Sequence, residues 1–156
     1  MKTTIFALFI LLLNLTSIMS QTVFDVSSLN PYKHYTDKEI RMTLGEPSRY
    51  FINEDELGEV REYQYGSKEK YDMFRCQEFA EVLEFVLETS TYFIFNNKIR
   101  VGDYVAKFSN IDNGILQKQS QCEYYFYLSK ELKEEYLTIK TNSNGVIISI
   151  SFLPSV

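Results

Sequence analysis

The only histidine in this 156-residue chain is His34, so any catalytic device that needs an imidazole would have to be built on that residue. Ser-His-Asp and Cys-His sites use histidine as the base that activates the nucleophile. His34 follows Asn30-Pro31 in a stretch without hydrophobic periodicity, and no Gly-x-Ser-x-Gly motif accompanies it. We therefore expect His34 to be a surface residue with no catalytic task.

Metal and phosphate chemistry also lack their usual residues. A zinc site uses several His or Cys ligands, and one His with two distant cysteines does not supply a usual set. The glycines are isolated, so no loop resembles those that hold the phosphates of a nucleotide. The sequence therefore predicts neither a bound metal nor a cofactor.

Carboxylates are the remaining residues that could act alone. Glycosidase-type hydrolysis needs two acids facing one another, and the candidates on strand-like segments are Glu62, Glu84, Glu88 and Glu123. At alternate positions of a strand, such residues are typical of a solvated face. A small hydrolase that uses carboxylates alone is therefore the alternative function. This alternative predicts a cleft in which two acidic side chains face one another and at least one has a raised pKa.

Tyrosines occupy alternate positions in two strand-like segments. Tyr63 and Tyr65 share one face of the first segment, and Tyr125 and Tyr127 share one face of the second. Tyrosine is enriched at protein interfaces because it combines a large contact area with a hydroxyl group. It is also frequent in strands that have no binding role. We expect these four side chains to form one exposed partner-binding patch, with ordinary strand composition as the alternative.

The N-terminus has the pattern of a secretory signal peptide. Lys2 supplies a positive charge, residues 5–13 are continuously apolar, and Ser20 is a small residue at the expected cut. The alternative is a membrane anchor, but a spanning helix needs about 20 consecutive apolar residues. We expect residues 1–20 to be removed and the protein to be periplasmic or extracellular. No membrane span would remain, and no cysteine near the cut could carry a lipid.

Export bears on the two cysteines. An even number of cysteines outside the reducing cytosol predicts one disulfide, which would join Cys76 and Cys122. Closing a loop of that length would stabilise the fold by about 4 kcal/mol on the chain-entropy model. The alternative is a pair of free thiols that pack as small hydrophobic groups.

The charge of the chain limits its partners. Loss of Lys2 with the signal peptide leaves 15 basic and 21 acidic residues, a net charge of −6. No basic cluster exists, so nucleic acid would be repelled. We expect the partner to be a protein.

A short helix is predicted from Thr36 onward. Thr36 and Glu39 have the spacing of a capping box, in which each side chain accepts from the other residue's backbone amide. Ile40 and Leu44 lie on one helical face, and Gly45 is a typical helix end.

A second short helix is predicted to begin at the N-cap residue Asp103. Period-two patterns predict strands in between and after these helices, at residues 60–65, 71–76, 123–128, 136–140 and 146–152. Residues 77–88 fit a helix or a strand, and the aromatic and β-branched residues that follow favour the strand.

The order of elements reads twice as one short helix followed by three strands. We therefore predict an α+β fold with an antiparallel sheet of about six strands and two short helices on one face, built from two α-β-β-β units at about residues 36–95 and 96–152. No linker separates the units, so residues 21–156 should form one domain.

The helix that ends in Leu44-Gly45-Glu46-Pro47-Ser48, followed by a meander, resembles the small bacterial outer-membrane assembly lipoproteins of the SmpA/OmlA type. Two such units in tandem resemble the β-lactamase inhibitor protein architecture. The resemblance covers about residues 36–152 as an order of elements, but the lipid-bearing cysteine is missing. It implies a non-enzymatic, partner-binding role, and no functional residue carries over. We therefore expect a binding module that uses the helix-free sheet face in an inhibitor, immunity or envelope-assembly role.

Overall fold

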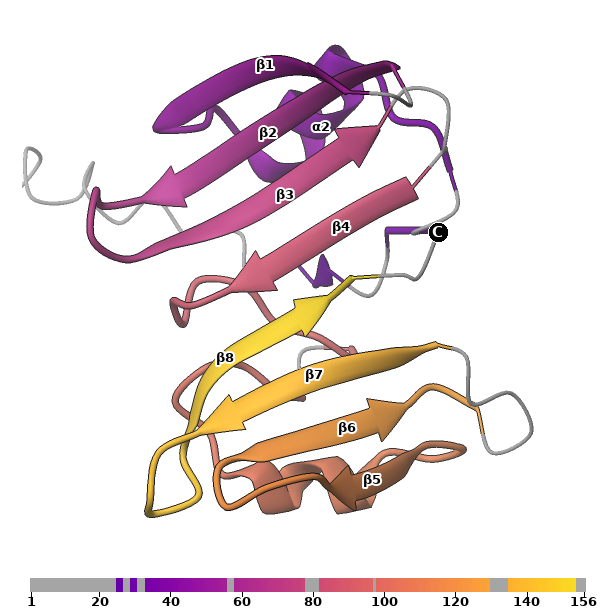
Figure 1. The fold of residues 1–156 in the computed structure, drawn as a ribbon, viewed down its shortest axis with the longest axis vertical. Coiled ribbons are helices and arrows are strands. Elements are labelled where there is room, and N and C mark those ends of the chain that lie inside the picture. The colour runs from indigo at the N-terminus through magenta and orange to yellow at the C-terminus, as the bar shows by residue number, and fades with distance from the viewer. Residues whose placement is uncertain are drawn as a thin grey trace, which may run out of the picture.

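The computed structural model describes residues 25–26, 29–30, 33–55, 58–77, 82–96, 98–129 and 135–153. Within these ranges it contains one α-helix of two turns, one 3-10 helix and a sheet of eight strands (Figure 1). The helical elements are α2 (Asp37–Leu44) and η2 (Val105–Asn110). The strands are β1 (Arg49–Asp55), β2 (Gly58–Gly66), β3 (Tyr71–Gln77), β4 (Val82–Leu87), β5 (Ile115–Lys118), β6 (Glu123–Tyr127), β7 (Tyr136–Thr141) and β8 (Ile147–Phe152).

The sheet consists of two antiparallel meanders joined edge to edge. Its strand order is β1-β2-β3-β4-β8-β7-β6-β5, so the first four strands form one half and the last four the other. The halves meet where β4 pairs with β8, with Phe85 opposite Phe152 and Leu87 opposite Ile150. Figure 1 shows the two meanders one above the other, with this join between them.

The predicted fold of about six strands and two helices in α-β-β-β units is therefore wrong. The sheet has eight strands, and only one of the two helical elements in the described ranges is an α-helix. The two unpredicted strands, β1 and β5, are the outer edges of the sheet. Residues 51–54 of β1 are all exposed. The alternation of apolar and polar residues that identifies a half-buried strand is therefore missing from this segment.

The helix α2 confirms its predicted capping box. The Glu39 backbone N–H donates to Thr36 Oγ1 at 3.2 Å, and the Thr36 N–H donates to Glu39 Oε2 at 2.9 Å. Gly45 ends the helix with a positive φ of 88° that favours glycine, and its N–H donates to the Arg41 carbonyl at 2.9 Å. Ile40 is fully buried beneath the helix.

The second helical element lacks such a cap. η2 begins after Tyr104, which makes no side-chain capping hydrogen bond, and Asp103 is not its N-cap. Asp103 instead accepts from the Arg100 backbone N–H at 3.0 Å and from Lys107 Nζ at 2.7 Å. The predicted α-helix is therefore a short 3-10 helix, as expected for a segment without a side-chain N-cap.

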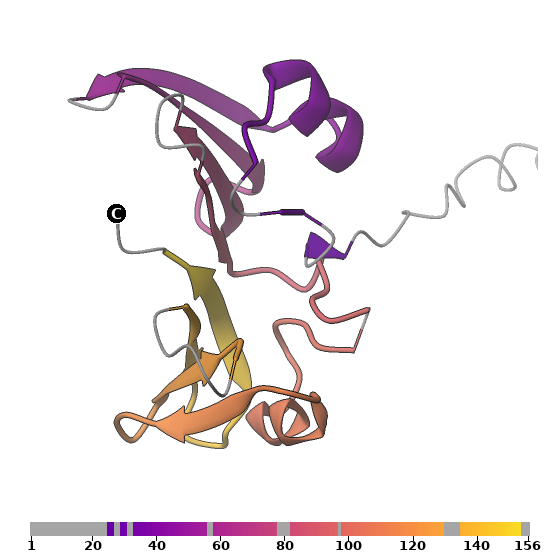
Figure 2. The same ribbon diagram turned by 90° about the vertical axis from the view of Figure 1, so that its right-hand side faces the viewer.

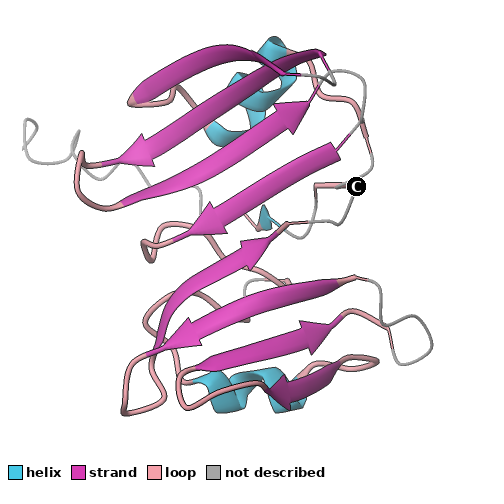
Figure 3. Cartoon of the chain, viewed as in Figure 1, coloured by secondary structure: helices cyan, strands magenta, loops and turns pink. Residues whose placement is uncertain are grey.

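Both helical elements cover the same face of the sheet. The Tyr65 hydroxyl of β2 donates to the Gly45 carbonyl at the end of α2, at 3.2 Å, and the Phe108 ring of η2 lies 4.9 Å from the Phe126 ring of β6. Figure 2 shows α2 and η2 on one side of the sheet, and in Figure 3 both lie behind the strands. We call this side the helix face and the opposite side the open face.

The core is a row of large apolar side chains on the helix face. Residues that are directly opposite one another in paired strands point to the same face. The register therefore aligns one buried residue from each of the six inner strands. In the sheet order β2-β3-β4-β8-β7-β6 these residues are Tyr63, Phe74, Phe85, Phe152, Leu137 and Phe126. This row crosses the β4–β8 join, so the two halves share one core.

The last strand departs from its predicted alternation. Strict period two places Ile148 with Ile150 and Phe152 on one face, yet Ile147 is 1% exposed and Ile148 is 48% exposed. The register with β7 shifts between Lys140 and Thr141, which skips Ile148. A β-bulge at this point turns Ile147 toward the core.

The predicted signal peptide, residues 1–20, lies outside the described residues, so its cleavage and the export of the protein stay predictions. In the ranges that the structure describes, no helix has the length and apolar character needed to cross a bilayer.

Candidate functional site

The structure divides the four predicted tyrosines between the two faces of the sheet. Tyr63 and Tyr65 are on the helix face, where they are 0% and 9% exposed. The Tyr63 ring lies 5.0 Å from the Tyr50 ring, and the Tyr65 ring lies 5.8 Å from the Phe74 ring. Burial raises the pKa of both phenols above the ordinary value of tyrosine. These two residues belong to the core and offer no contact surface.

The predicted contiguous patch of four tyrosines is therefore wrong. In β2, Glu62 and Gln64 take the open face and the intervening tyrosines take the core. In β6, Phe126 takes the core position, so its neighbours Tyr125 and Tyr127 point to the open face. The prediction matched the two strands by their Tyr-rich sequences, although their tyrosines face opposite sides of the sheet.

Tyr125 and Tyr127 lie together on the open face with a third tyrosine from the neighbouring strand. Tyr136 of β7 is directly opposite Tyr127, and its ring stacks on that of Tyr125 with 4.4 Å between centroids. The Tyr127 and Tyr136 rings are 5.6 Å apart, and those of Tyr125 and Tyr127 are 6.5 Å apart. We call Tyr125, Tyr127 and Tyr136 the tyrosine cluster. Tyr136 was predicted as a strand residue but not as a site residue.

All three members of the tyrosine cluster are half-buried. The pKa of Tyr125 is raised, mainly by the neighbouring Tyr136 phenol. On the side toward the join, the register continues through Thr138 of β7 and Ser151 of β8. These short side chains are themselves half-buried. The cluster therefore combines ordered rings with exposed ring surface, which is the pattern expected of a contact site.

The other half of the open face is charged. The register places Glu62, Arg75 and Glu84 in one row across β2, β3 and β4. Arg75 forms an ion pair with Glu84 at 3.3 Å, and the Gln64 side-chain amide donates to Glu62. This row therefore carries charges of both signs, with an excess of acid.

Beside this row, Glu62 and Glu88 line a shallow hollow of about 200 Å³, together with Tyr71, Met73 and Val86. Of the four candidate acids, only these two line it. The Glu62 carboxylate already accepts from Gln64. The hydrolase alternative stays a prediction, and its location would be this hollow.

The cysteines are not joined. Cys76 is buried in β3, where burial raises the pKa of its thiol to about 12. Cys122 precedes β6 in the other half of the sheet, and both thiols are free. The predicted disulfide is therefore absent from the structure, in which the two residues lie in different meanders. Among the described residues, no group of three His, Cys, Asp or Glu side chains could hold a metal ion.

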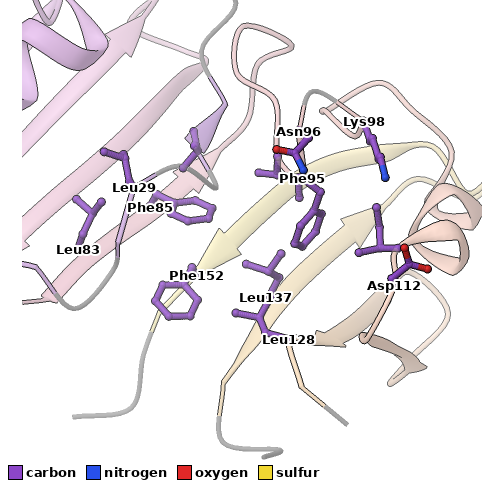
Figure 4. A pocket seen from close by; sticks show the side chains of 13 residues that line it. Leu29, Leu83, Phe85, Phe95, Asn96, Lys98, Asp112, Leu128, Leu137 and Phe152 are labelled. Carbon is purple, nitrogen blue, oxygen red and sulfur yellow. The ribbon is translucent and has the colours of Figure 1, made fainter.

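A pocket opens on the helix face at the join of the two meanders (Figure 4). It has a volume of about 510 Å³, with Phe85 and Phe152 in its apolar wall and Asn96, Lys98 and Asp112 as its polar residues. Phe85 is 9% exposed and Phe152 is 2% exposed. These two rings would offer a ligand little accessible apolar surface and hence weak hydrophobic stabilisation. We interpret the pocket as a thinly packed part of the core. The residues that line it are spread along the chain from Val26 to Phe152, so no local sequence pattern could have predicted the pocket.

Comparisons of the chain with protein-family models, with curated proteins and with solved structures find no match. The resemblance to SmpA/OmlA-type lipoproteins and to the β-lactamase inhibitor protein architecture therefore stays an expectation from the sequence.

Proposed function

We propose that this protein is an exported, non-enzymatic module that binds a protein partner through the open face of its sheet. The observation that carries the proposal is the tyrosine cluster, in which Tyr125, Tyr127 and Tyr136 stack side by side on a face that no helix of the described structure covers.

The cluster has the physical properties of an interface anchor. Each aromatic side chain buries a large area on contact, and its hydroxyl can still donate or accept a hydrogen bond. Interface residues that contribute most binding energy are enriched in tyrosine. Because the three rings already pack against one another, a partner would lose little free energy in ordering them. The cluster therefore favours binding through preformed contacts.

The charge of the remaining open face favours a partner with a basic surface. Glu62, Glu84 and Glu88 lie on the β2–β4 half, and Arg75 is the basic residue paired with Glu84. The chain as a whole also carries more acidic than basic residues. Complementary charge speeds the encounter of two proteins and fixes their orientation. A basic rim on the partner would thus meet the acidic half while an apolar or aromatic surface meets the cluster.

The test is affinity capture from an envelope extract, with the chain lacking residues 1–20 as bait and mass spectrometry to identify the bound protein. The double variant Tyr125→Ser/Tyr127→Ser should weaken capture by at least about 30-fold, the effect of removing one interface hot spot. Its melting temperature should change little, because cross-strand pairs of half-buried rings contribute about 0.2–1 kcal/mol each.

Tyr104→Ser is the matched control, because Tyr104 is 62% exposed and precedes η2, away from the cluster. This variant should capture the partner as the unmodified chain does. Equal capture by the double variant and the control would contradict the proposal. So would a large fall in the melting temperature of the double variant with unaltered binding, since the rings would then be structural.

A further inference from the structure

The two outer edges of the sheet differ in how they are protected. An edge strand directs every second N–H and C=O group away from the sheet, where another strand can pair with it. β5 has four residues, ends in Lys118 and contacts η2. A short strand, a lysine and a neighbouring helix are all features that prevent edge pairing. The β5 edge is therefore protected.

In the described structure the β1 edge is less protected, and α2 contacts it through Arg41, which lies 4.8 Å from the Tyr50 ring on the helix face. β1 is seven residues long, contains neither lysine nor proline, and pairs with β2 in one unbroken register from Arg49 to Asp55. Phe51 and Ile52 at its centre are 43% and 56% exposed. A long, regular edge with an apolar centre is a surface suited to pairing with another strand.

The sequence of β1 is complementary to itself in the antiparallel direction. Arg49 stands at one end, Glu54 and Asp55 at the other, and Phe51-Ile52 in the middle. Antiparallel pairing of two copies brings the basic end of each against the acidic end of the other. Parallel pairing would instead bring like charges together. The charge order therefore favours a second copy of this chain as the partner, paired in the antiparallel direction, although each Arg49 also donates to the Ser67 carbonyl of its own chain at 3.1 Å.

We propose that the protein forms a symmetric homodimer through antiparallel pairing of β1 with β1 of a second copy, centred on Ile52. In this register Ile52 is opposite Ile52 of the second copy, Tyr50 is opposite Glu54, and Arg49 is opposite Asp55. Pairing centred on one residue always matches even positions with even and odd with odd. The residues whose N–H and C=O groups point outward are either the even-numbered or the odd-numbered ones. In both cases they are opposite the residues of the second copy whose N–H and C=O groups also point outward.

The proposed register also keeps each side chain on its own face. A two-fold axis perpendicular to the sheet leaves the helix faces of both copies on one side and the open faces on the other. Phe51 is on the open face opposite Asn53 of the second copy, and the two Phe51 residues become diagonal neighbours about 7–8 Å apart. Two exposed aromatic rings would thus cover one another. The dimer joins two eight-stranded sheets into one continuous sheet.

The test is sedimentation equilibrium of the chain lacking residues 1–20 over a range of concentrations. We expect the unmodified chain to behave as a dimer. Ile52→Lys and Ile52→Glu should each shift it to the monomer, because both place like charges opposite one another at the centre of the interface. An equimolar mixture of the two variants should again form a dimer, since lysine would then be opposite glutamate.

Gln117→Lys is the matched control, because it introduces the same charge at an exposed position of the other edge strand, and it should leave the dimer intact. Circular dichroism of each variant should show the unmodified spectrum. A monomeric unmodified chain at its highest soluble concentration would overturn the proposal. A dimer that persists in Ile52→Lys, or variants that stay monomeric when mixed, would overturn the proposed register.

Discussion

The two meanders share an arrangement of strands but present different surfaces on the open face. The β1–β4 half carries the mixed charges of Glu62, Arg75 and Glu84. The β5–β8 half carries the tyrosine cluster, flanked by Thr138 and Ser151 toward the join. In both halves the meander determines where side chains lie, whereas the residues on each strand determine what the surface can bind.

The halves also differ in how their helical elements are held. α2 has a complete capping box and a glycine at its end, whereas η2 has no side-chain cap. η2 depends instead on tertiary packing, since Phe108 is 1% exposed and its ring contacts the Phe95 and Phe126 rings. Local signals therefore stabilise one helical element, and the core stabilises the other.

The largest predicted effect tests whether the halves form one cooperative unit. Phe74 and Phe126 occupy the same core row in opposite halves and are 0% and 1% exposed. Phe74→Ala and Phe126→Ala should each lower the free energy of unfolding by about 3–5 kcal/mol, because each leaves a cavity. Urea unfolding followed by fluorescence and by circular dichroism should show one coincident transition for both variants. Two separated transitions in either variant would show that the halves unfold independently.

A smaller effect sharpens the comparison of the two helical elements. Thr36→Ala removes the side-chain acceptor of the capping box and should lower the free energy of unfolding by about 1 kcal/mol. Tyr104→Ala, at the equivalent position before η2, should change it by less than about 0.5 kcal/mol, because Tyr104 is exposed and caps nothing. Thermal or urea unfolding of the two variants measures the difference. Equal losses would mean that both positions act as caps or that neither does.

The smallest effect concerns pH and is confined to α2. Hydrogen bonds from the Thr36 backbone, and then from Lys33, lower the pKa of Glu39 from 4.5 to about 2. Because the folded pKa lies below the unfolded one, this carboxylate stabilises the fold above about pH 4.5, and the contribution disappears as the pH falls toward 2. The melting temperature of Glu39→Gln should therefore lie slightly below that of the unmodified chain at neutral pH and converge with it at low pH. A difference that stays constant with pH would contradict this origin.

The parts of the fold that the sequence predicts correctly depend on local signals. Thr36 and Glu39 define α2 because a capping box needs only four consecutive residues. The strand interpretation of residues 82–87 is confirmed, since Leu83, Phe85 and Leu87 are buried and the residues between them are half-exposed. In both cases neighbouring residues alone contain the information.

The parts that it misses depend on residues far apart in the chain. Arg49–Asp55 is a strand because it pairs with β2, although its own exposed residues show no alternation. Tyr136 belongs to the site because it pairs with Tyr127, and the register of β6 and β7 is needed to see this. In the run from Tyr124 to Tyr127 every residue is aromatic, so polarity does not show which side faces the core. The two predicted tyrosines that lie on the core face instead, Tyr63 and Tyr65, belong to β2.

The position of β8 has a consequence for how an exported chain would mature. β8 is the last strand in the sequence, yet it lies in the middle of the sheet between β4 and β7. Until residues 147–152 have been synthesised, β4 has no partner on one side and the apolar row ends at Phe85. The first meander would therefore keep an unpaired edge at β4 until synthesis of the chain is almost complete. A chain truncated before β8 should be cleaved readily by an added protease rather than form a smaller stable protein.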